Sequence, residues 1–302
     1  MTTRGLVVAT RKSQLALAQA RGWMSELVAA HPGLSVSELH VTTTGDRVQD
    51  RSLTAIGGKG LFIKEVEEAI IARRADLAVH SMKDVPAELA PSLVIGCGPW
   101  REDPRDVLVT RTGCGLADLP PGSRVGTSSL RRQVQLLDRR PDLHIVPLRG
   151  NVDTRIRRCH EGVVDAVILA RAGLARLGML ERATQTLDAG LCLPAVGQGA
   201  LAIERRADDI ELQRMLEPLI DAETAIAVAA ERGVMVAVAG SCQIPVAAYA
   251  VRDQDQLWLR GMLAEADGSR LRRRELRLAW PESETDAQQV GLELGRELGQ
   301  AT

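Results

Sequence analysis

The sequence alternates short apolar runs with amphipathic segments, and it does so twice. Apolar runs of strand length, separated by segments with helical spacing, occupy residues 6–9, 39–43 and 77–80. The alternation restarts near residue 100, with apolar runs at residues 124–126, 144–148 and 164–170. Because alternating strands and helices form mostly parallel sheets covered by helices, the sequence predicts two α/β domains.

Two segments share one design. Residues 9–19 (ATRKSQLALAQ) and residues 126–136 (GTSSLRRQVQL) each pass from a strand through Thr and Ser into a predicted helix. A serine at a helix start accepts a hydrogen bond from the backbone, and Ser13 is placed to cap its helix. The repeat indicates two similar domains that face each other.

The last third of the chain has a different pattern. Residues 193–204 are apolar and glycine-rich, and we interpret them as a crossover between domains. Residues 223–239 form a predicted helix, segments of alternating polarity follow, and residues 284–298 form a closing helix. We therefore expect a smaller α+β domain at this end.

Composition excludes several classes of protein. The 302 residues are 45% hydrophobic with a mean hydropathy of −0.04, which indicates a globular protein. The net charge is −1 and aromatic residues make up 2%, so we expect no nucleic-acid partner. Five cysteines without a CxxC pair favour neither a disulfide framework nor a metal site. No run is long enough to span a membrane and no signal segment is evident, so we expect a cytoplasmic protein without a membrane partner.

Polar residues follow the predicted strands. In open α/β sheets, ligands bind beyond the carboxyl ends of the strands, and helix N-termini carrying Ser and Arg suit carboxylates. We therefore expect a small polyanion in a cleft between the two domains. The residues at these places are Arg11, Ser13, Asp46, Lys59, 81–84, 128–132 and 149–155. Since only four of the 38 basic residues are lysine, a solvated surface role is the alternative for any one arginine.

Residues 57–60 (GGKG) invite comparison with a phosphate-binding loop. The spacing excludes it, because Gly60 stands where that loop needs a hydroxyl. Two alternatives remain for these residues: a glycine loop that presents Lys59 to an anion, or a simple turn at a helix start.

Asp84 and Cys242 are the candidates for chemistry. Asp84 lies beside Lys83 just after an apolar strand, so its carboxylate suits an acid, a base or a cation stabiliser. A structural role in a turn is the alternative. Cys242 is flanked by glycine and proline, and it is either a reactive thiol on an exposed loop or a small buried residue. We expect His80 to be a buried core histidine.

A series of motifs occurs along nearly the whole chain, in the order RKSQLALAQ, TTGD, GGKGLF, HSMKDVP, GTSSLRRQ, LRGN followed by TR, AGLARLG, LPAVGQGAL and GSCQIP. Each motif is short, but the ordered set is specific. By these motifs the chain resembles the porphobilinogen deaminase (hydroxymethylbilane synthase) family.

The resemblance implies a transferase of tetrapyrrole (porphyrin and haem) biosynthesis. It implies a dipyrromethane cofactor held through a thioether to Cys242, on which four porphobilinogen molecules are condensed to hydroxymethylbilane with loss of ammonia. The family's catalytic carboxylate corresponds to Asp84. The residues that correspond to cofactor contacts are Ser81, Lys83, Asp46, Ser129, Arg131 and Arg132. Those that correspond to substrate contacts are Arg11, Ser13, Lys59, Ser128, Arg149, Arg155 and Arg176.

The resemblance also implies a fold and an assembly. Two α/β domains like those of periplasmic binding proteins, 1–99 with 200–217 and 100–199, would enclose the cleft, and 218–302 would form the third domain with the cofactor cysteine. A monomer is implied.

Two other interpretations fit the sequence less well than the enzyme does. A two-lobed anion-binding module fits the paired domains, but it does not account for the third domain or for Asp84 together with the Cys242 motif. An arginine-rich nucleic-acid binder conflicts with the near-zero net charge and the few aromatic residues.

Overall fold

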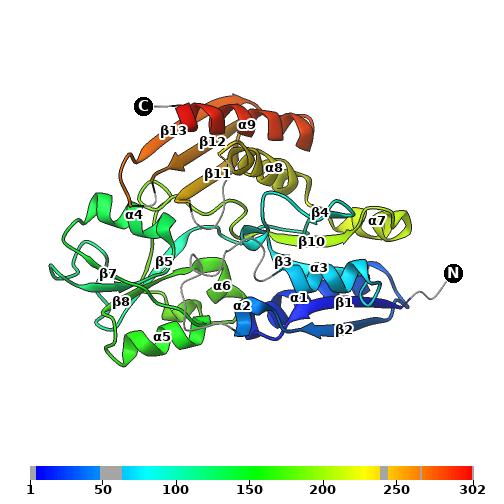
Figure 1. Ribbon diagram of the computed structural model, residues 1–302, viewed down its shortest axis with the longest axis horizontal. Helices are drawn as coiled ribbons and strands as arrows, with labels where there is room; N and C mark the ends of the chain where they lie inside the picture. Colours follow the sequence, from blue (N-terminus) through cyan, green and yellow to red (C-terminus); the bar gives the residue numbers. More distant parts are fainter. Residues whose placement is uncertain (1–4, 48–62, 239–243, 266, 301–302) are drawn as a thin grey trace. The chain divides into compact units, whose positions relative to one another are not determined.

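The structure is a computed structural model that describes residues 5–47, 63–238, 244–265 and 267–300 (Figure 1). The chain divides into two compact units. Residues 1–101 and 200–225 form the first, and residues 102–199 and 226–302 form the second. Among the described residues, no helix combines the length and the apolar character needed to cross a membrane.

The first unit is built on a five-stranded sheet. Its strands, in spatial order, are β2 (Val36–Val41), β1 (Leu6–Arg11), β3 (Leu77–Ser81), β10 (Leu201–Arg206) and β4 (Leu93–Cys97). The first three strands are parallel, whereas β10 runs antiparallel to both β3 and β4. The carboxyl ends of β1, β2 and β3 therefore meet at one edge of the sheet.

Helices cover both faces of this sheet, and each face has its own apolar core. Helix α1 (Gln14–Ala30) packs Trp23 and Leu27 against one face together with α7 (Ile210–Leu216). Helix α3 (Lys64–Ile71) packs Val66 against the other. The shorter helices of the unit are α2 (Thr44–Arg47), the 3-10 turn η2 (Met82–Asp84) and the turn η4 (Glu217–Leu219).

The second unit contains a sheet of the same topology. Its strands, in spatial order, are β7 (His144–Val146), β6 (Arg124–Gly126), β8 (Ala166–Ala170), β5 (Asp106–Thr110) and β9 (Gln185–Thr186). Strands β6, β7 and β8 are parallel, and β5 runs antiparallel to its two neighbours. The associated helices are α4 (Leu130–Arg139), α5 (Val152–His160), α6 (Arg171–Arg176) and the turn η3 (Leu180–Arg182). The predicted repeat of one strand–helix design is thus confirmed.

The second unit also holds a three-stranded antiparallel sheet. Its strands are β11 (Val246–Asp253), β12 (Gln256–Leu263) and β13 (Arg272–Ala279). Helices α8 (Ala222–Ala237) and α9 (Glu284–Gln300) cover one face through Val234 and Leu294. On the other face, Met262 packs with Val134 of α4. The expected α/β class with a smaller α+β region is confirmed, while the three domain boundaries remain predictions.

A strand boundary in the sequence interpretation was wrong, and two details were absent from it. The expected strand at residues 39–43 begins earlier, at Val36, because the edge strand follows its register with β1. The crossover at 193–204 contains the start of a strand, β10, which completes the first sheet. Each large sheet is mostly parallel, as predicted, but one strand in each, β10 or β5, runs antiparallel to its neighbours, and the sequence interpretation did not include that strand.

Candidate active site

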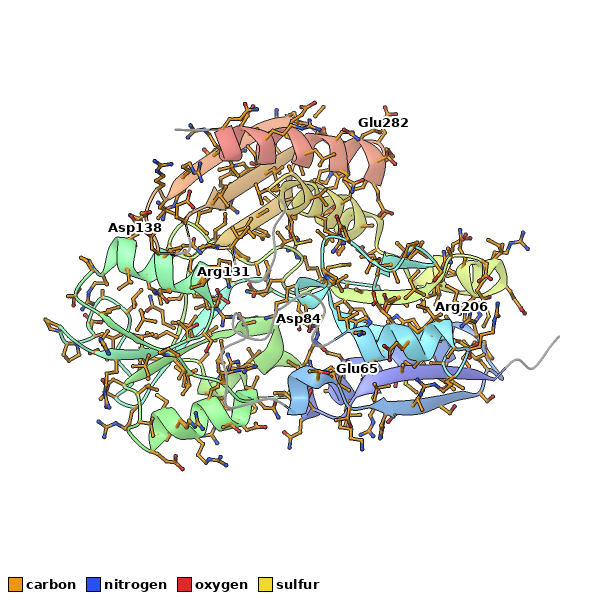
Figure 2. The ribbon with its side chains drawn as sticks, viewed as in Figure 1. Glu65, Asp84, Arg131, Asp138, Arg206 and Glu282 are labelled. Atoms are coloured by element: carbon orange, nitrogen blue, oxygen red, sulfur yellow. The ribbon has the colours of Figure 1, made fainter. Side chains whose placement is uncertain are left out.

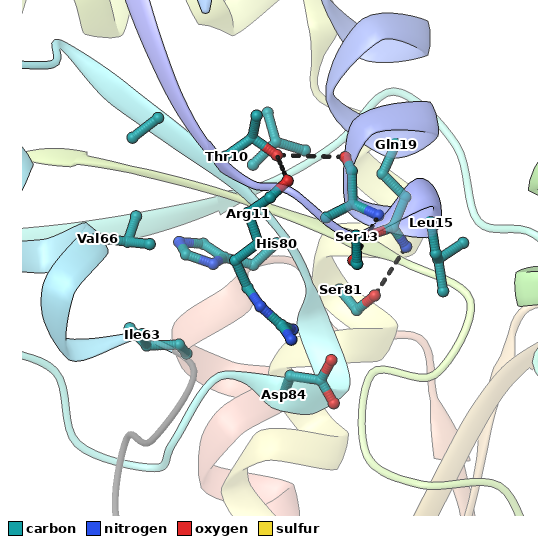
Figure 3. Close-up of a pocket in the computed structure, with 13 residues that line it drawn as sticks. Thr10, Arg11, Ser13, Leu15, Gln19, Ile63, Val66, His80, Ser81 and Asp84 are labelled. Atoms are coloured by element: carbon teal, nitrogen blue, oxygen red, sulfur yellow. Dashed lines mark hydrogen bonds between the residues drawn. The ribbon is translucent and has the colours of Figure 1, made fainter. Parts of the chain in front are cut away.

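A pocket in the first unit opens at the carboxyl ends of β1 and β3 (Figure 3). It brings together four residues expected from the sequence, namely Arg11, Ser13, Ser81 and Asp84. Its other lining includes Gln19 of α1, His80 of β3 and apolar side chains such as Ile63, Val66 and Leu15. Because β1 and β3 are parallel neighbours, the residues that follow them converge at one place.

Asp84 is held at the rim of this pocket by a short turn. Strand β3 ends at Ser81, and η2 carries the chain from Met82 to Asp84. Met82 is buried, and its backbone N–H donates to the carbonyl of Ala200 at 3.0 Å, so the turn is anchored to the sheet. The Asp84 side chain is exposed, and Figure 3 shows the Arg11 guanidinium and the Asp84 carboxylate pointing toward one another.

The serines of the pocket have defined partners. Ser13 caps α1, and its Oγ accepts a hydrogen bond from the N–H of Ala16 at 3.3 Å. The capping role predicted for Ser13 is therefore confirmed. Nε2 of Gln19, a buried side chain, donates to Oγ of Ser81 at 2.7 Å and fixes that hydroxyl at the pocket wall.

The second unit gathers its predicted residues at the corresponding edge of its own sheet. Arg131, which Figure 2 labels, and Arg132 are both buried and lie in the first turn of α4. They converge on Asp106, a fully buried carboxylate at the start of β5. The N···O distances are 2.7 Å from Arg131 and 2.8 Å from Arg132. Burial by itself would raise the pKa of Asp106, but the two guanidinium charges outweigh it and hold the pKa far below its usual range.

Two further side chains complete this cluster. Nε2 of Gln198 donates to Asp106 at 2.9 Å. The thiol of Cys192 donates to Asp106 at 3.3 Å, and burial together with the nearby carboxylate raises the pKa of Cys192 to about 12. Cys192 therefore stays a neutral thiol, and Asp106 has no capacity left for another donor.

Ser128 and Ser129 lie where β6 passes into α4. Oγ of Ser129 caps α4 by accepting from the N–H of Arg132 at 3.4 Å, and Oγ of Ser128 donates to the carbonyl of Leu148 at 3.1 Å. Leu148 precedes Arg149, which is half-buried. Ser128 therefore joins the ends of β6 and β7, as expected for neighbouring parallel strands.

The other predicted arginines follow β7 and β8. Nε of Arg155 in α5 donates to the carbonyl of Gly150 at 2.8 Å. Arg176, at the end of α6, donates to the carbonyl of Gly199 at 2.6 Å. Burial lowers the pKa of Arg176 to about 10, partly offset by the charge of Glu102. A cation kept away from water in this way binds an anion more strongly than a solvated one.

The structure gives less detail on the surroundings of four predicted site residues. Lys59 and Cys242 lie outside the described residues. Asp46 belongs to α2, which follows β2, and Lys83 is half-buried within η2. Within the described ranges, no group of three or more His, Cys, Asp or Glu residues is arranged to hold a metal ion.

Comparison with known proteins identifies the family. Residues 6–214 match the model described as "Porphobilinogen deaminase, dipyromethane cofactor binding domain", and residues 225–300 match "Porphobilinogen deaminase, C-terminal domain". A porphobilinogen deaminase of Sorangium cellulosum is 62% identical over 97% of this chain and 98% of its own length. Another, of Syntrophobacter fumaroxidans, is 50% identical over 99% of this chain and 95% of its own length. The chain belongs to the porphobilinogen deaminase family.

Membership in the porphobilinogen deaminase family confirms the resemblance carried by the motifs. It also confirms the expected class of enzyme, a transferase of tetrapyrrole biosynthesis, and dipyrromethane as the cofactor of the matched domain. The assignment of individual residues to the site remains a prediction.

Solved structures similar to this chain include two periplasmic binding proteins. The aliphatic sulphonate binding protein of Escherichia coli is 15% identical, with a TM-score of 0.43 over 78% of this chain and 70% of that one. An arginine-specific protein of Salmonella typhimurium is 14% identical, with a TM-score of 0.42 over 74% of this chain and 94% of that one.

The residues of both units fit the carboxylate-bearing pyrroles of the porphobilinogen deaminase family. In the first unit, Arg11 offers a guanidinium to a carboxylate, and Asp84 offers an acceptor to a pyrrole N–H. In the second unit, Arg131 and Arg132 bring two positive charges to the single negative charge of Asp106. The excess positive charge favours an anionic ligand beside this cluster.

Sequence reasoning missed three residues that hold the predicted ones in place, namely Asp106, Gln19 and Gln198. The only local signal for Asp106 is an acidic residue that opens the apolar run DVLVT, whose first side chain is buried. Gln19 and Gln198 lie within motifs of the family, but nothing in their neighbourhood shows that their side chains are buried.

Proposed function

We propose that the chain condenses four porphobilinogen molecules into hydroxymethylbilane with Asp84 as its catalytic carboxylate. The observation that carries the proposal is the pocket where β1 and β3 end, in which an exposed carboxylate and the Arg11 guanidinium point toward one another (Figure 3). A site for a zwitterionic pyrrole needs both charges. The dipyrromethane cofactor, when bound, supplies the free α-carbon to which the first substrate unit is joined.

Asp84 meets the electrostatic demand of each condensation. The C–N bond of the substrate's aminomethyl group breaks, ammonia leaves, and positive charge develops on the pyrrole nitrogen. A new C–C bond then forms at the carbon that ammonia left, and the α-carbon that forms this bond loses its proton. The proton and the ammonia together balance as ammonium. A fixed carboxylate beside the pyrrole N–H stabilises the positive charge and can hold that proton between the two events.

The basic residues bind the substrate's acetate and propionate groups. We assign Arg11 and Ser13 in the first unit to this role, with Ser128, Arg149, Arg155 and Arg176 in the second. Support comes from their positions at strand ends and from the partial burial of the arginines. Lys59 is assigned with them on the motif alone.

Ser81, Lys83, Asp46, Ser129, Arg131 and Arg132 are assigned to the cofactor. The excess positive charge of the Arg131–Arg132–Asp106 cluster supports this role for the two arginines. The thiol of Cys242 is assigned as the attachment point through a thioether.

We also propose three domains, 1–99 with 200–217, 100–199 and 218–302, in a monomeric cytoplasmic protein. The two five-stranded sheets and the separate β11–β13 sheet support this division. Sedimentation equilibrium at 32.6 kDa would support the monomer, and a larger species would contradict it.

The first experiment is the intact mass of the denatured protein, followed by peptide mapping around Cys242. We expect an excess of two porphobilinogen units less two ammonia molecules, located on Cys242 and absent from Cys242→Ser. An unmodified Cys242 that also fails to gain this mass when porphobilinogen is added would refute the attachment. Consumption of porphobilinogen by the wild-type protein tests the reaction itself.

A further inference from the structure

His80 lies behind the pocket, among ionisable groups from neighbouring elements. Its imidazole Nε2 is 2.9 Å from Oε2 of Glu204, and both side chains are almost fully buried. In the antiparallel pair of β3 and β10, His80 is opposite Ala202, so Glu204 is two residues away on the same face of the sheet. Since a carboxylate only accepts, the imidazole donates its Nε2–H to Glu204.

Arg11 lies on the other side of His80. The parallel register of β1 with β3 pairs Val8 with Leu77 and Ala9 with Ala78. Continuing that register by two residues brings Arg11 beside His80 on the same face of the sheet. Arg11 and His80 both line the pocket.

Glu204 is a buried carboxylate with an incomplete set of donors. Its Oε1 is buried and has no hydrogen-bond partner among the described residues. Glu67 of α3 supplies no positive charge, and burial, followed by the charge of Glu204, raises the pKa of Glu67. A buried anion of this kind attracts any cation within reach, and Arg11 is one strand beyond the imidazole.

We propose that His80 is a positioning residue that occupies Glu204 and thereby keeps the Arg11 guanidinium in the pocket. Figure 3 shows that the guanidinium points to Asp84. This is the direction in which the proposed function has it meet a substrate carboxylate. Without the imidazole, Arg11 would turn toward Glu204 and leave the pocket without its cation. The proposal rests on the proposed function, in which Arg11 binds substrate.

The test compares His80→Leu with the double variant His80→Leu/Glu204→Leu. In holoenzyme of the single variant, we expect KM for porphobilinogen to rise about tenfold, the effect of losing one charge-assisted contact. The double variant removes the anion as well, so KM should return to within about threefold of the wild-type value. A role confined to packing would predict no recovery of KM in the double variant, because Glu204→Leu changes the buried packing at a second position without restoring the imidazole.

Crystal structures of the variants give a readout that does not depend on activity. We expect the Arg11 guanidinium to bond to Glu204 in His80→Leu and to point to Asp84 again in the double variant. The matched control is Asp209→Asn, which weakens the buried ion pair with Arg206, 3.1 Å long, at the far end of β10. This control should lower the melting temperature and leave KM unchanged.

Two results would overturn the proposal. One is a folded His80→Leu enzyme with wild-type KM and an unmoved Arg11. The other is a folded double variant that stays as impaired as the single variant. If His80→Leu does not fold, the double variant decides, because it leaves no unpaired buried charge. Should the wild-type protein not consume porphobilinogen, the proposed function fails, while the direction of Arg11 in the crystal structures still tests the role of His80.

Discussion

Asp106 carries one negative charge and faces two positive ones. Arg131, Arg132 and Gln198 all donate to its carboxylate, and its side chain has no contact with water. Two guanidinium groups held this way cannot be solvated, so the carboxylate is what makes their burial possible. The same carboxylate fixes the direction of the two guanidinium groups, which are the proposed cofactor contacts.

Asp106→Asn should therefore destabilise the protein strongly. The amide keeps the shape but leaves two buried cations without a counter-charge, and we expect the free energy of unfolding to fall by about 3–5 kcal/mol. Urea denaturation measures it. The control is Asp103→Asn, because the side chain of its partner Arg105 is 39% exposed. This variant should lower the free energy of unfolding by no more than about 1 kcal/mol. Equal losses in the two variants would contradict this account of Asp106.

Asp84→Asn tests chemistry with little effect on stability. The side chain is exposed, so the melting temperature should stay within a degree or two, as for an ordinary surface substitution. The amide cannot stabilise positive charge or hold a proton, and we expect kcat to fall by roughly 100-fold or more. Steady-state kinetics on holoenzyme measure the effect, and a kcat near that of the wild type would remove Asp84 from its catalytic role.

Glu38 makes stability depend on pH in the acid range. Hydrogen bonds from Arg21 and then from His40, at 2.7 and 2.6 Å, lower the pKa of Glu38 from 4.5 to about 2. A carboxyl with a depressed pKa stabilises the fold above its ordinary pKa, and this contribution is lost as the pH falls toward 2. Glu38→Gln should therefore lower the melting temperature at neutral pH and reduce its fall on acidification. Glu26→Gln, at an exposed position of α1, should match the wild-type pH dependence throughout.

At the scale of elements, helices α8 and α9 approach each other through glycine. A Cβ built on Gly291 would overlap the carbonyl oxygen of Ala230 and lie 2.9 Å from Cα of Gly233. Backbone atoms cannot yield as a flexible side chain does, so the helices must separate to admit a methyl group. The close crossing sets how tightly the two helices cover the β11–β13 sheet.

Gly291→Ala should lower the free energy of unfolding by at least about 2 kcal/mol, since the methyl group overpacks a closed helix crossing. Gly299→Ala is the matched control in the same helix. A Cβ there meets nothing within 4 Å, and alanine favours helix over glycine by up to about 1 kcal/mol. Thermal unfolding of both variants measures the difference, and a neutral Gly291→Ala would show that the crossing can open without cost.

At the scale of the molecule, local patterns explain what the sequence predicted. Strands and the residues after them are encoded by neighbours in the chain, so Arg11, Ser81 and Asp84 were placed at a strand end and the structure brings them to one pocket. The partners of such residues are encoded elsewhere. Glu204 reaches His80 across 124 positions, and its position in the sequence gives no sign of that contact.

The antiparallel strands were missed for the same reason. From the sequence alone, the residues of β10 are interpreted as part of a glycine-rich crossover. Their pairing with β3 and β4 depends on residues about a hundred positions earlier, which a local pattern does not show. The paired Ser13 and Ser129 caps, by contrast, are local, and they are visible in the repeat of one short motif.

The placement of β10 has a consequence for synthesis on the ribosome. The first sheet needs β10 between β3 and β4, yet Leu201 is translated long after Cys97, the last residue of β4. Translation proceeds at about 5–20 residues per second, so the position between β3 and β4 lacks its strand for roughly 5–20 seconds. All five strands of the second sheet lie within residues 106–186, so that sheet is fully emerged first. We expect arrest-peptide force measurements on nascent chains to report the second sheet folding before the first, although the first begins the chain.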